Sequence, residues 1–215
     1  GVDKWQLERE RLVEILRREG IRDERVLQSI GTVPRHLFVS PEVEDYAYEN
    51  VPLAIGKGQT ISQPFIVALM AEALQPKPSD RVLEVGTGSG YAAAVLSKLV
   101  RKVYTIERYA ELAEEAQKRF SFLKYGNIEV RVGDGTKGWE EESPFDGIVV
   151  AAAGPAVPPS LKRQLAVGGR LVIPIGDRTS QKLVKVVRLS HKEFEEKTID
   201  YVRFVPLVGE EGWPS

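Results

Sequence analysis

RVLEVGTGSGY, residues 81–91, is the stretch that decides how the rest of the chain folds. A short apolar run with one acid inside it, Glu84, breaks into glycines at three alternate positions, Gly86, Gly88 and Gly90, after which apolar residues resume. This order predicts a buried strand, a tight turn and the start of a helix. Glycines let the backbone approach a ligand closely and adopt positive φ. The stretch therefore predicts a ligand site at a βα turn; the alternative is an ordinary glycine-rich turn that binds nothing.

The spacing of the glycines separates two kinds of ligand. A dinucleotide-binding turn has its third glycine three positions after the second, where a pyrophosphate rests on the helix N-terminus. Here that position holds Tyr91, and Glu84 at the strand end would repel a pyrophosphate. The same carboxylate favours a positively charged ligand, such as the ammonium or sulfonium of S-adenosylmethionine. The pattern E-x-G-x-G-x-G resembles the first motif of the class I methyltransferases.

Strand-like and helix-like segments alternate regularly after this turn. Alternating βα units predict a parallel sheet covered by helices on both faces, with the ligand beyond the carboxyl ends of the strands. Two later strand-like runs, 183–189 and 197–208, predict an antiparallel pair at one sheet edge. We therefore expect the α/β class, with a doubly wound, mostly parallel sheet and antiparallel C-terminal strands. The expected strands are 81–86, 102–107, 128–132, 145–153 and 170–176, and the expected helices between them are 90–100, 109–124 and 160–165.

The N-terminal part predicts helices over 3–19 and 23–30, and Pro64 opens another helix that reaches Leu74. Between them, residues 32–63 are rich in Pro, Gly and aromatics and show no sustained period. A structureless connection of that length is uncommon unless it lines or covers a site. We expect one domain over residues 1–215, in which 1–78 hold the N-terminal helices and a substrate-site loop, 79–176 the donor-binding core and 177–215 the C-terminal strands.

Composition excludes several kinds of protein. Thirty Lys and Arg against 31 Asp and Glu leave a net charge of −1, which gives no general case for nucleic-acid or anionic membrane partners. No apolar run approaches about 18 residues, and the N-terminus GVDKWQLERE is too charged for a signal peptide, so we expect a cytoplasmic protein. With no Cys and only His36 and His191, we expect no metal site. One Met and 28% charged residues favour a thermophilic source.

Acids follow the next two strands at the same sheet edge. Glu107 ends the second strand, where an acid commonly accepts hydrogen bonds from both ribose hydroxyls of a nucleotide ligand. The alternative is a solvated acid paired with Arg108 or Lys102. Asp134 lies between two glycines after the third strand, where it could reach an adenine amino group. Its alternative is a plain Asp-Gly turn.

The fourth strand ends in AAAGP, residues 151–155, which offers no side chain to orient an amine or to take its proton. Methyltransferases that act on amino groups usually carry Asn or Asp followed by Pro-Pro at this place. The absence favours an acceptor that needs no general base. A carboxylate, with a reference pKa near ~4, is deprotonated at pH 7 and can attack a methyl sulfonium directly. The protein then has to align the reacting atoms and exclude water.

A second glycine-containing loop, GKGQTISQ at residues 56–63, leads into the helix that Pro64 opens. A helix N-terminus offers free N–H groups and a favourable dipole to an anion, so this loop predicts the acceptor pocket. Ser62 would orient the acceptor carboxylate through its hydroxyl. The local sequence alone favours the simpler alternative, in which Ser62 only caps the helix.

Five segments together resemble the protein-L-isoaspartate O-methyltransferase family. They are VPRHLFV at 33–39, YAYENVPLAIGKGQTISQPFIVALM at 46–70, VLEVGTGSGY at 82–91, GDG at 133–135 and FVPLVGEEGW at 204–213. The resemblance covers nearly the whole chain. Its most specific part is the combination of GxGQTIS with VLExGTGSGY, because neither motif alone would identify the family.

The resemblance implies transfer of a methyl group from S-adenosylmethionine to the free α-carboxylate of L-isoaspartyl, and some D-aspartyl, residues in damaged proteins and peptides. The ester then cyclises to a succinimide. Ser62 matches the family's catalytic serine, and we also expect a monomer. The positions that match the donor site are Ile61, Gln63, Pro64, Glu84, Gly86, Thr87, Gly88, Gly90, Glu107, Arg108, Asp134 and Gly135; those that match the substrate site are Gly58, Gln59, Thr60, Ser62, Val205, Pro206, Leu207 and Val208.

Two other functions stay open at this point. One is a methyltransferase of RNA or of a small molecule on the same fold, against which the neutral net charge and the missing Asn-Pro-Pro signature argue. The other is a non-enzymatic binding module with a vestigial donor pocket. The intact acids Glu84, Glu107 and Asp134 argue against that module.

Overall fold

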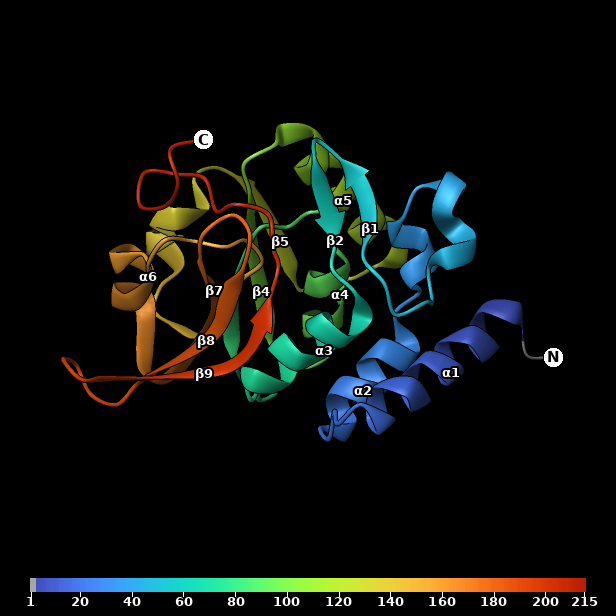
Figure 1. Ribbon diagram of the computed structural model, residues 1–215, viewed down its shortest axis with the longest axis horizontal. Coiled ribbons are helices and arrows are strands. Elements are labelled where there is room, and N and C mark those ends of the chain that lie inside the picture. Colours follow the sequence, from blue (N-terminus) through green and yellow to red (C-terminus); the bar gives the residue numbers. More distant parts are fainter. Residues whose placement is uncertain (1–2) are drawn as a thin grey trace.

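A seven-stranded sheet with helices on both faces forms the body of the molecule in the computed structural model, which describes residues 3–215 (Figure 1). The strand order is β5-β4-β3-β6-β7-β8-β9. A separate two-stranded sheet, β1-β2, lies in the N-terminal third of the chain. The large sheet consists of β3 (Arg81–Val85), β4 (Lys102–Glu107), β5 (Ile128–Val132), β6 (Phe145–Val150), β7 (Leu165–Gly176), β8 (Gln181–Arg188) and β9 (Phe194–Val202).

The topology confirms the predicted doubly wound α/β fold. Strands β5, β4, β3, β6 and β7 pair in parallel, and β8 and β9 add antiparallel pairs at one edge. The chain passes from β3 outward to β5 and then returns to the other side of β3 as β6. This reversal creates a topological switch point at the carboxyl end of β3, where open α/β sheets bind their ligands.

Helices cover both faces because the central strands are apolar on both sides. Successive residues of β3 show this, since Val82 belongs to one core cluster and Leu83 to the other. The first cluster joins α1 to α5 to the sheet; the second joins the sheet to α6 and to Leu207 of the C-terminal tail. The helices are α1 (Lys4–Arg18), α2 (Glu24–Thr32), α3 (Pro64–Ala73), α4 (Tyr91–Ser97), α5 (Ala110–Leu123) and α6 (Pro159–Gln164).

The segment 32–63 corrects the sequence analysis, because it is not structureless. It contains two 3-10 helices, η1 (Arg35–Phe38) and η2 (Pro41–Tyr46), and a hairpin of β1 (Leu53–Gly56) with β2 (Gln59–Ile61). Lys57 and Gly58 form the turn with φ of 53° and 68°. A two-residue turn with both φ values positive matches the twist of a hairpin. The sequence hides this hairpin because lysine is an unusual residue at the first of these positions.

Several strand boundaries also differ from the prediction, since β6 ends at Val150 rather than at 153 and β9 begins at Phe194 rather than at 197. Strand β7 begins at Leu165 rather than at 170, because an irregularity in its pairing with β6 accommodates the Gly-Gly sequence that reads as a loop. Strand β9 ends at Val202, so the prediction of a strand through 208 was wrong. Residues 203–208 leave β8 and run beside the end of β6, with a bridge between Ala153 and Pro206. Proline lacks the N–H that a continued ladder would need.

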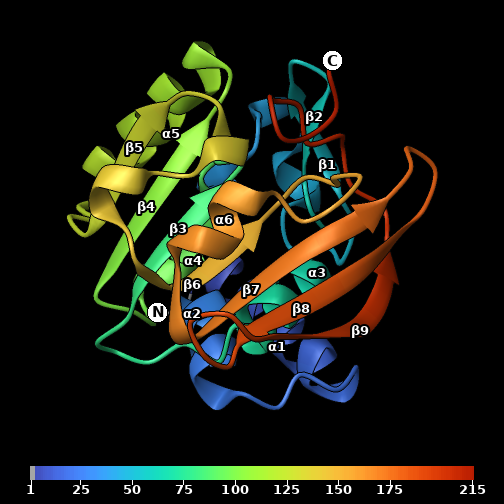
Figure 2. The same ribbon diagram turned by 90° about the vertical axis from the view of Figure 1, so that its left-hand side faces the viewer.

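Hairpin and tail meet at one end of the molecule. Both views place the β1–β2 hairpin and the C-terminus at the upper end, and α1 and α2 at the lower end (Figures 1 and 2). The carboxyl end of β3 faces the hairpin, since the side chain of Ile55 lies over Gly88 of the glycine turn. Within residues 3–215, none of the helices has the length and apolarity that crossing a membrane requires.

Candidate active site

The glycine turn after β3 adopts the backbone that its sequence predicts. Gly86, Gly88 and Gly90 have φ of 96°, 55° and 94°, a region that other residues rarely adopt. Gly90 also has no room for a side chain, because a Cβ there would lie 2.7 Å from the ring of Phe120. The turn thus places backbone N–H groups at the carboxyl ends of the parallel strands, directly before α4.

Glu107 anchors this turn. Its carboxylate accepts hydrogen bonds from the Gly88 N–H at 2.9 Å and from the Tyr109 N–H at 3.0 Å, and only 5% of the residue is exposed. The alternative of a solvated acid paired with Arg108 or Lys102 was wrong, since Glu107 is buried, Lys102 pairs with Glu129, and no ion pair joins Glu107 to Arg108 within residues 3–215. Each carboxylate oxygen keeps a further lone pair, and Glu107 lines the cavity at this edge. Two ribose hydroxyls fit that capacity.

Glu84 lies deeper in the same cavity and is fully buried. One carboxylate oxygen accepts a hydrogen bond from the Thr105 hydroxyl at 2.6 Å, and the other has no partner within residues 3–215. Burial raises the pKa of Glu84 to about 8; the Thr105 hydrogen bond opposes this shift and the nearby charge of Glu107 adds to it. An unpaired buried carboxylate oxygen suits a cationic ligand group, which fits the ammonium of S-adenosylmethionine.

The cavity brings together most of the predicted site residues. Its walls come from the hairpin and the residues after it, from the segments that follow β3, β4, β5 and β6, and from the C-terminal tail. The sequence-predicted residues that line it are Gln59, Thr60, Ile61, Ser62, Glu84, Gly86, Thr87, Gly88, Glu107, Arg108, Gly135, Val205, Pro206, Leu207 and Val208.

Five predicted residues do not line the cavity. Gly58 is in the hairpin turn, Gln63 and Pro64 begin α3, and Gly90 packs against α5. Asp134 accepts hydrogen bonds from the backbone of Thr136 and Glu210 and from the Thr136 hydroxyl. Partial burial disfavours its charge, but these hydrogen bonds outweigh burial and lower the pKa of Asp134. Its carboxylate thus connects the turn after β5 to the tail.

Ser62 is not a helix cap. The N-cap position of α3 is Gln63, and the Phe65 N–H in the first turn is bonded by the side chain of Asn50 at 2.9 Å. The Ser62 hydroxyl makes no hydrogen bond within residues 3–215, although the residue is half-buried and lines the cavity. The cap alternative, which the local sequence favoured, was therefore wrong. The hydroxyl remains available to a ligand.

Hydrogen bonds of Ala153 and Glu211, together called the tail clamp, fix the wall that residues 205–208 form. Ala153 binds both sides of Pro206, donating to the Val205 carbonyl at 2.7 Å and accepting from the Leu207 N–H at 2.9 Å. Beyond this wall, the Glu211 carboxylate accepts hydrogen bonds from the N–H and the hydroxyl of Ser160 at the start of α6. The tail is thus bonded on both sides of its cavity-facing part.

Sequence reasoning missed several cavity residues. Tyr91 opens α4 and Phe204 precedes the tail wall, and both were interpreted only as apolar packing positions or strand residues. Ala151 and Ala152 were singled out for lacking functional groups, but they also form part of the wall. The position of Tyr91 directly after the glycine turn is the one signal that could have identified it. The remaining residues missed are Val67, Val85, Ser89, Ala92 and Ile106.

A doubly wound sheet, a glycine turn at its switch point and an anchored acid at the end of the next strand define an S-adenosylmethionine-dependent methyltransferase of class I. The family model described as Protein-L-isoaspartate(D-aspartate) O-methyltransferase (PCMT) matches residues 7–212. The chain belongs to this family.

Individual relatives agree with the family assignment. A protein-L-isoaspartate O-methyltransferase of Pelotomaculum thermopropionicum is 60% identical over 96% of this chain and 90% of its own. One of Dictyoglomus turgidum is 54% identical over 98% and 95%. Among solved structures, a protein-L-isoaspartate O-methyltransferase aligns with a TM-score of 0.85 and 30% identity over 95% of this chain and 67% of its own. A Plasmodium falciparum protein described as such an enzyme was crystallised with S-adenosyl-L-homocysteine and aligns with a TM-score of 0.80 and 27% identity over 93% and 98%.

Proposed function

We propose that this cavity binds S-adenosylmethionine beside the glycine turn and receives the free α-carboxylate of an L-isoaspartyl residue next to Ser62. The reaction is that of the family: methyl transfer to the carboxylate of L-isoaspartyl, and some D-aspartyl, residues in damaged proteins and peptides. One observation carries the residue assignment. Ser62, with its uncommitted hydroxyl, lines the same cavity as the acids Glu84 and Glu107.

The donor half of the cavity carries the groups that S-adenosylmethionine requires. Glu107 would accept hydrogen bonds from the ribose hydroxyls, Glu84 would pair with the amino acid ammonium, and the backbone at Gly135 would lie beside the adenine; all three residues line the cavity. Bound there, the sulfonium supplies an electrophilic methyl group. The protein's own part is to hold donor and acceptor in line and to exclude water, which is the role of Ile61 and the hairpin above the turn.

The acceptor half needs no general base, because its substrate group is already a carboxylate at neutral pH. In keeping with this, the end of β6 contributes only Ala151 and Ala152 to the cavity. Ser62 donates a hydrogen bond that orients the carboxylate. Val205 to Val208 offer backbone to the substrate peptide. Protein and peptide are thus the proposed partners, and the cytoplasmic location stays a prediction.

Ser62→Ala tests this assignment. We expect the variant to reduce kcat on an isoaspartyl peptide by about 10- to 100-fold, because orientation of the reacting group is lost. Donor affinity and melting temperature should stay near those of the parent protein, since the hydroxyl bonds nothing within residues 3–215. Ser40→Ala is the matched control, from the same segment but outside the cavity. Undiminished turnover in Ser62→Ala would remove the role of Ser62.

The reaction is tested with matched peptides. Purified protein with labelled S-adenosylmethionine should esterify an isoaspartyl peptide and leave its aspartyl twin unmodified. Equal rates on both peptides would contradict the substrate assignment. A salt-sensitive association with RNA would instead indicate a nucleic-acid substrate.

A further inference from the structure

Arg35 in η1 is fully buried, and within residues 3–215 its guanidinium bonds only carbonyl oxygens and no acid. Its Nε and Nη1 donate no hydrogen bond to this part of the chain. Burial lowers the pKa of Arg35, with nearby Tyr91 acting in the opposite direction, but a guanidinium stays protonated in proteins. A buried charge without a counter-charge costs several kcal/mol. Such a residue needs an explanation other than stability.

Arg35 contacts the chain at both open ends of the β1–β2 hairpin, just after β2 and just before β1. Nη2 donates to the carbonyl of Ser62 at 3.1 Å, directly after β2, and approaches the carbonyl of Val51 at 3.5 Å, just before β1. At the hairpin tip, Lys57 forms an exposed ion pair with Glu111 of α5 at 3.2 Å. Exposed pairs contribute less than about 1 kcal/mol. The buried guanidinium is therefore the firmer of the two attachments.

Arg35 also connects this hairpin to the donor side of the cavity. Its guanidinium lies 4.7 Å from the centre of the Tyr91 ring, and Phe38 contacts the same ring edge-on at 5.7 Å. Tyr91 is the first residue of α4, immediately after the glycine turn, and lines the cavity. A single side chain thus contacts the backbone of Ser62 and a residue fixed to the donor turn.

We propose that Arg35 is a positioning residue for methyl transfer: it links the Ser62 carbonyl to the Tyr91 ring and thereby sets the distance between the Ser62 hydroxyl and the donor. This inference rests on the proposed function of Ser62. Displacement between catalytic groups of about 1 Å can reduce a rate about 100-fold, so a fixed attachment at this point is worth a costly buried charge.

Arg35→Met removes the donors and the charge while filling a similar volume. We expect kcat to fall about 10- to 100-fold, the dissociation constant for S-adenosylmethionine to change less than about threefold, and Arg35→Lys to recover part of the activity through one N–H to Ser62. The melting temperature should stay close to the parent value, because an unpaired buried charge is lost together with its hydrogen bonds. Parent-like kcat in folded Arg35→Met, or in Arg35→Lys if the first variant does not fold, overturns the proposal.

Ser62→Ala distinguishes failure of this inference from failure of the proposed function, because it removes the hydroxyl and keeps the carbonyl that Arg35 binds. If Arg35 acts through the hydroxyl, Arg35→Met/Ser62→Ala should lose no more than about twofold relative to Ser62→Ala alone. Multiplied losses overturn the role of Arg35 and leave that of Ser62 intact. A fully active Ser62→Ala overturns the proposed function, and the Arg35 proposal with it.

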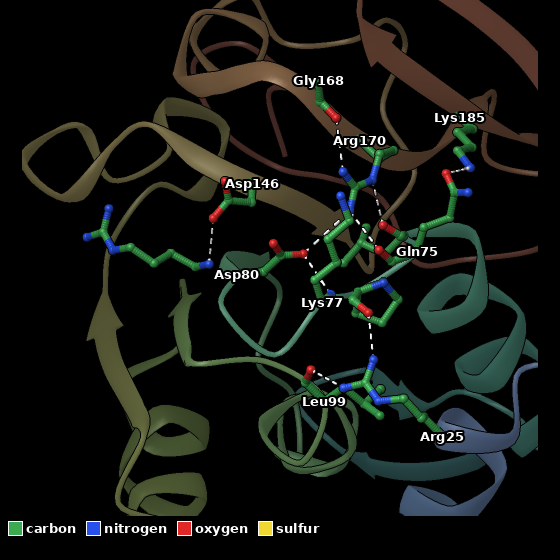
Figure 3. A network of polar contacts seen from close by, with 12 residues as sticks. Arg25, Gln75, Lys77, Asp80, Leu99, Asp146, Gly168, Arg170 and Lys185 are labelled. Atoms are coloured by element: carbon green, nitrogen blue, oxygen red, sulfur yellow. Dashed lines mark hydrogen bonds and ion pairs between the residues drawn. The ribbon is translucent and has the colours of Figure 1, made fainter.

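Arg170 provides a matched control for burial of an arginine. It is 9% exposed and donates to the carbonyls of Leu74, Gln75 and Gly168 and to Asp80 (Figure 3). This network joins the end of α3 to the amino ends of the strands, away from the cavity. Arg170→Met should lower the melting temperature and leave kcat within about twofold of the parent. A loss of kcat as large as that of Arg35→Met would assign both effects to general destabilisation and overturn the proposal.

Discussion

Glu84 and Glu107 line the same cavity, but their carboxyl groups differ in how many hydrogen bonds they accept from the protein. Glu107 receives two backbone N–H groups, whereas one oxygen of Glu84 receives nothing. The difference follows from position, since Glu84 lies inside the central strand β3, whereas Glu107 is the last residue of β4 and reaches turn N–H groups that no strand partner binds. Glu84 is thus a buried acid with one unpartnered oxygen in the proposed donor site, and its protonation should report on donor binding.

Stability should depend on pH through Glu84. Its pKa is raised from 4.5 in the unfolded chain to about 8 in the folded protein. The folded state holds a proton that the unfolded state has released, so the contribution of Glu84 to the free energy of unfolding decreases as the pH rises through this window. In Glu84→Gln without donor, the melting temperature should exceed that of the parent by several degrees at pH 9 and by less at pH 5.

S-adenosylmethionine should reverse this order, because in the proposed site its ammonium would pair with the ionised Glu84 of the parent protein. Thermal denaturation at the two pH values, with and without donor, checks both statements. Parallel pH curves for the parent and Glu84→Gln would mean that Glu84 ionises normally.

The role of a single residue could be predicted where it depends on neighbours in sequence. It could not be predicted where a residue distant in sequence supplies the deciding contact. The glycine turn and Glu107 follow from spacing within one βα unit, and their geometry agrees with it. Ser62 was favoured as a cap because the sequence shows a serine before Pro64, but Asn50, twelve positions earlier, bonds the helix start instead. Asp134 was assigned toward adenine, whereas its hydrogen bonds connect it to Glu210 in the tail.

At the scale of elements, the parallel core was predicted from alternation and the two elements that cover the site were not. The hairpin was not predicted because its turn holds Lys57 in a left-handed conformation. The pairing of β1 with β2 stabilises this conformation, which lysine itself does not prefer. The course of the tail was not predicted, because an apolar run resembles a strand although β9 ends at Val202 and the following residues instead form a bridge from Pro206 to Ala153. In both cases tertiary contacts override local propensity.

The tail clamp at Glu211 allows the tail to be tested as an element. Glu211→Ala removes two hydrogen bonds to Ser160, so the wall at 205–208 should become mobile. We expect the KM for an isoaspartyl peptide to rise about 5- to 10-fold, which corresponds to roughly 1 to 1.4 kcal/mol, with donor affinity unchanged. Glu210→Ala, which loses only an exposed pair with Lys137, is the control and should change KM little. Equal effects of the two variants would contradict the tail clamp.

Across the whole molecule, the site depends on contacts between stretches far apart in the chain. Residues near 61, 85, 107 and 206 meet in one cavity at the sheet's switch point. Sequence periodicity predicts which edge of the sheet carries the ligand, but not which loops fold over that edge. Arg35 illustrates the limit, because its sequence neighbours give no sign that it binds Ser62, 27 positions later.

The oligomeric state depends on whether an edge strand of the sheet pairs with a second molecule. Strand β9 lies at one edge and pairs only with β8 within residues 3–215. An open edge invites pairing with a second copy unless charges oppose it. Glu195, Glu196 and Lys197 are exposed along β9, so we expect a monomer of 23.9 kDa by light scattering. Glu195→Val/Lys197→Val should associate as concentration rises, whereas the Gln counterparts of both should stay monomeric because they remain polar. A parent protein that scatters as a dimer would contradict the monomer, and a monomeric valine variant would show that these charges do not keep the edge free.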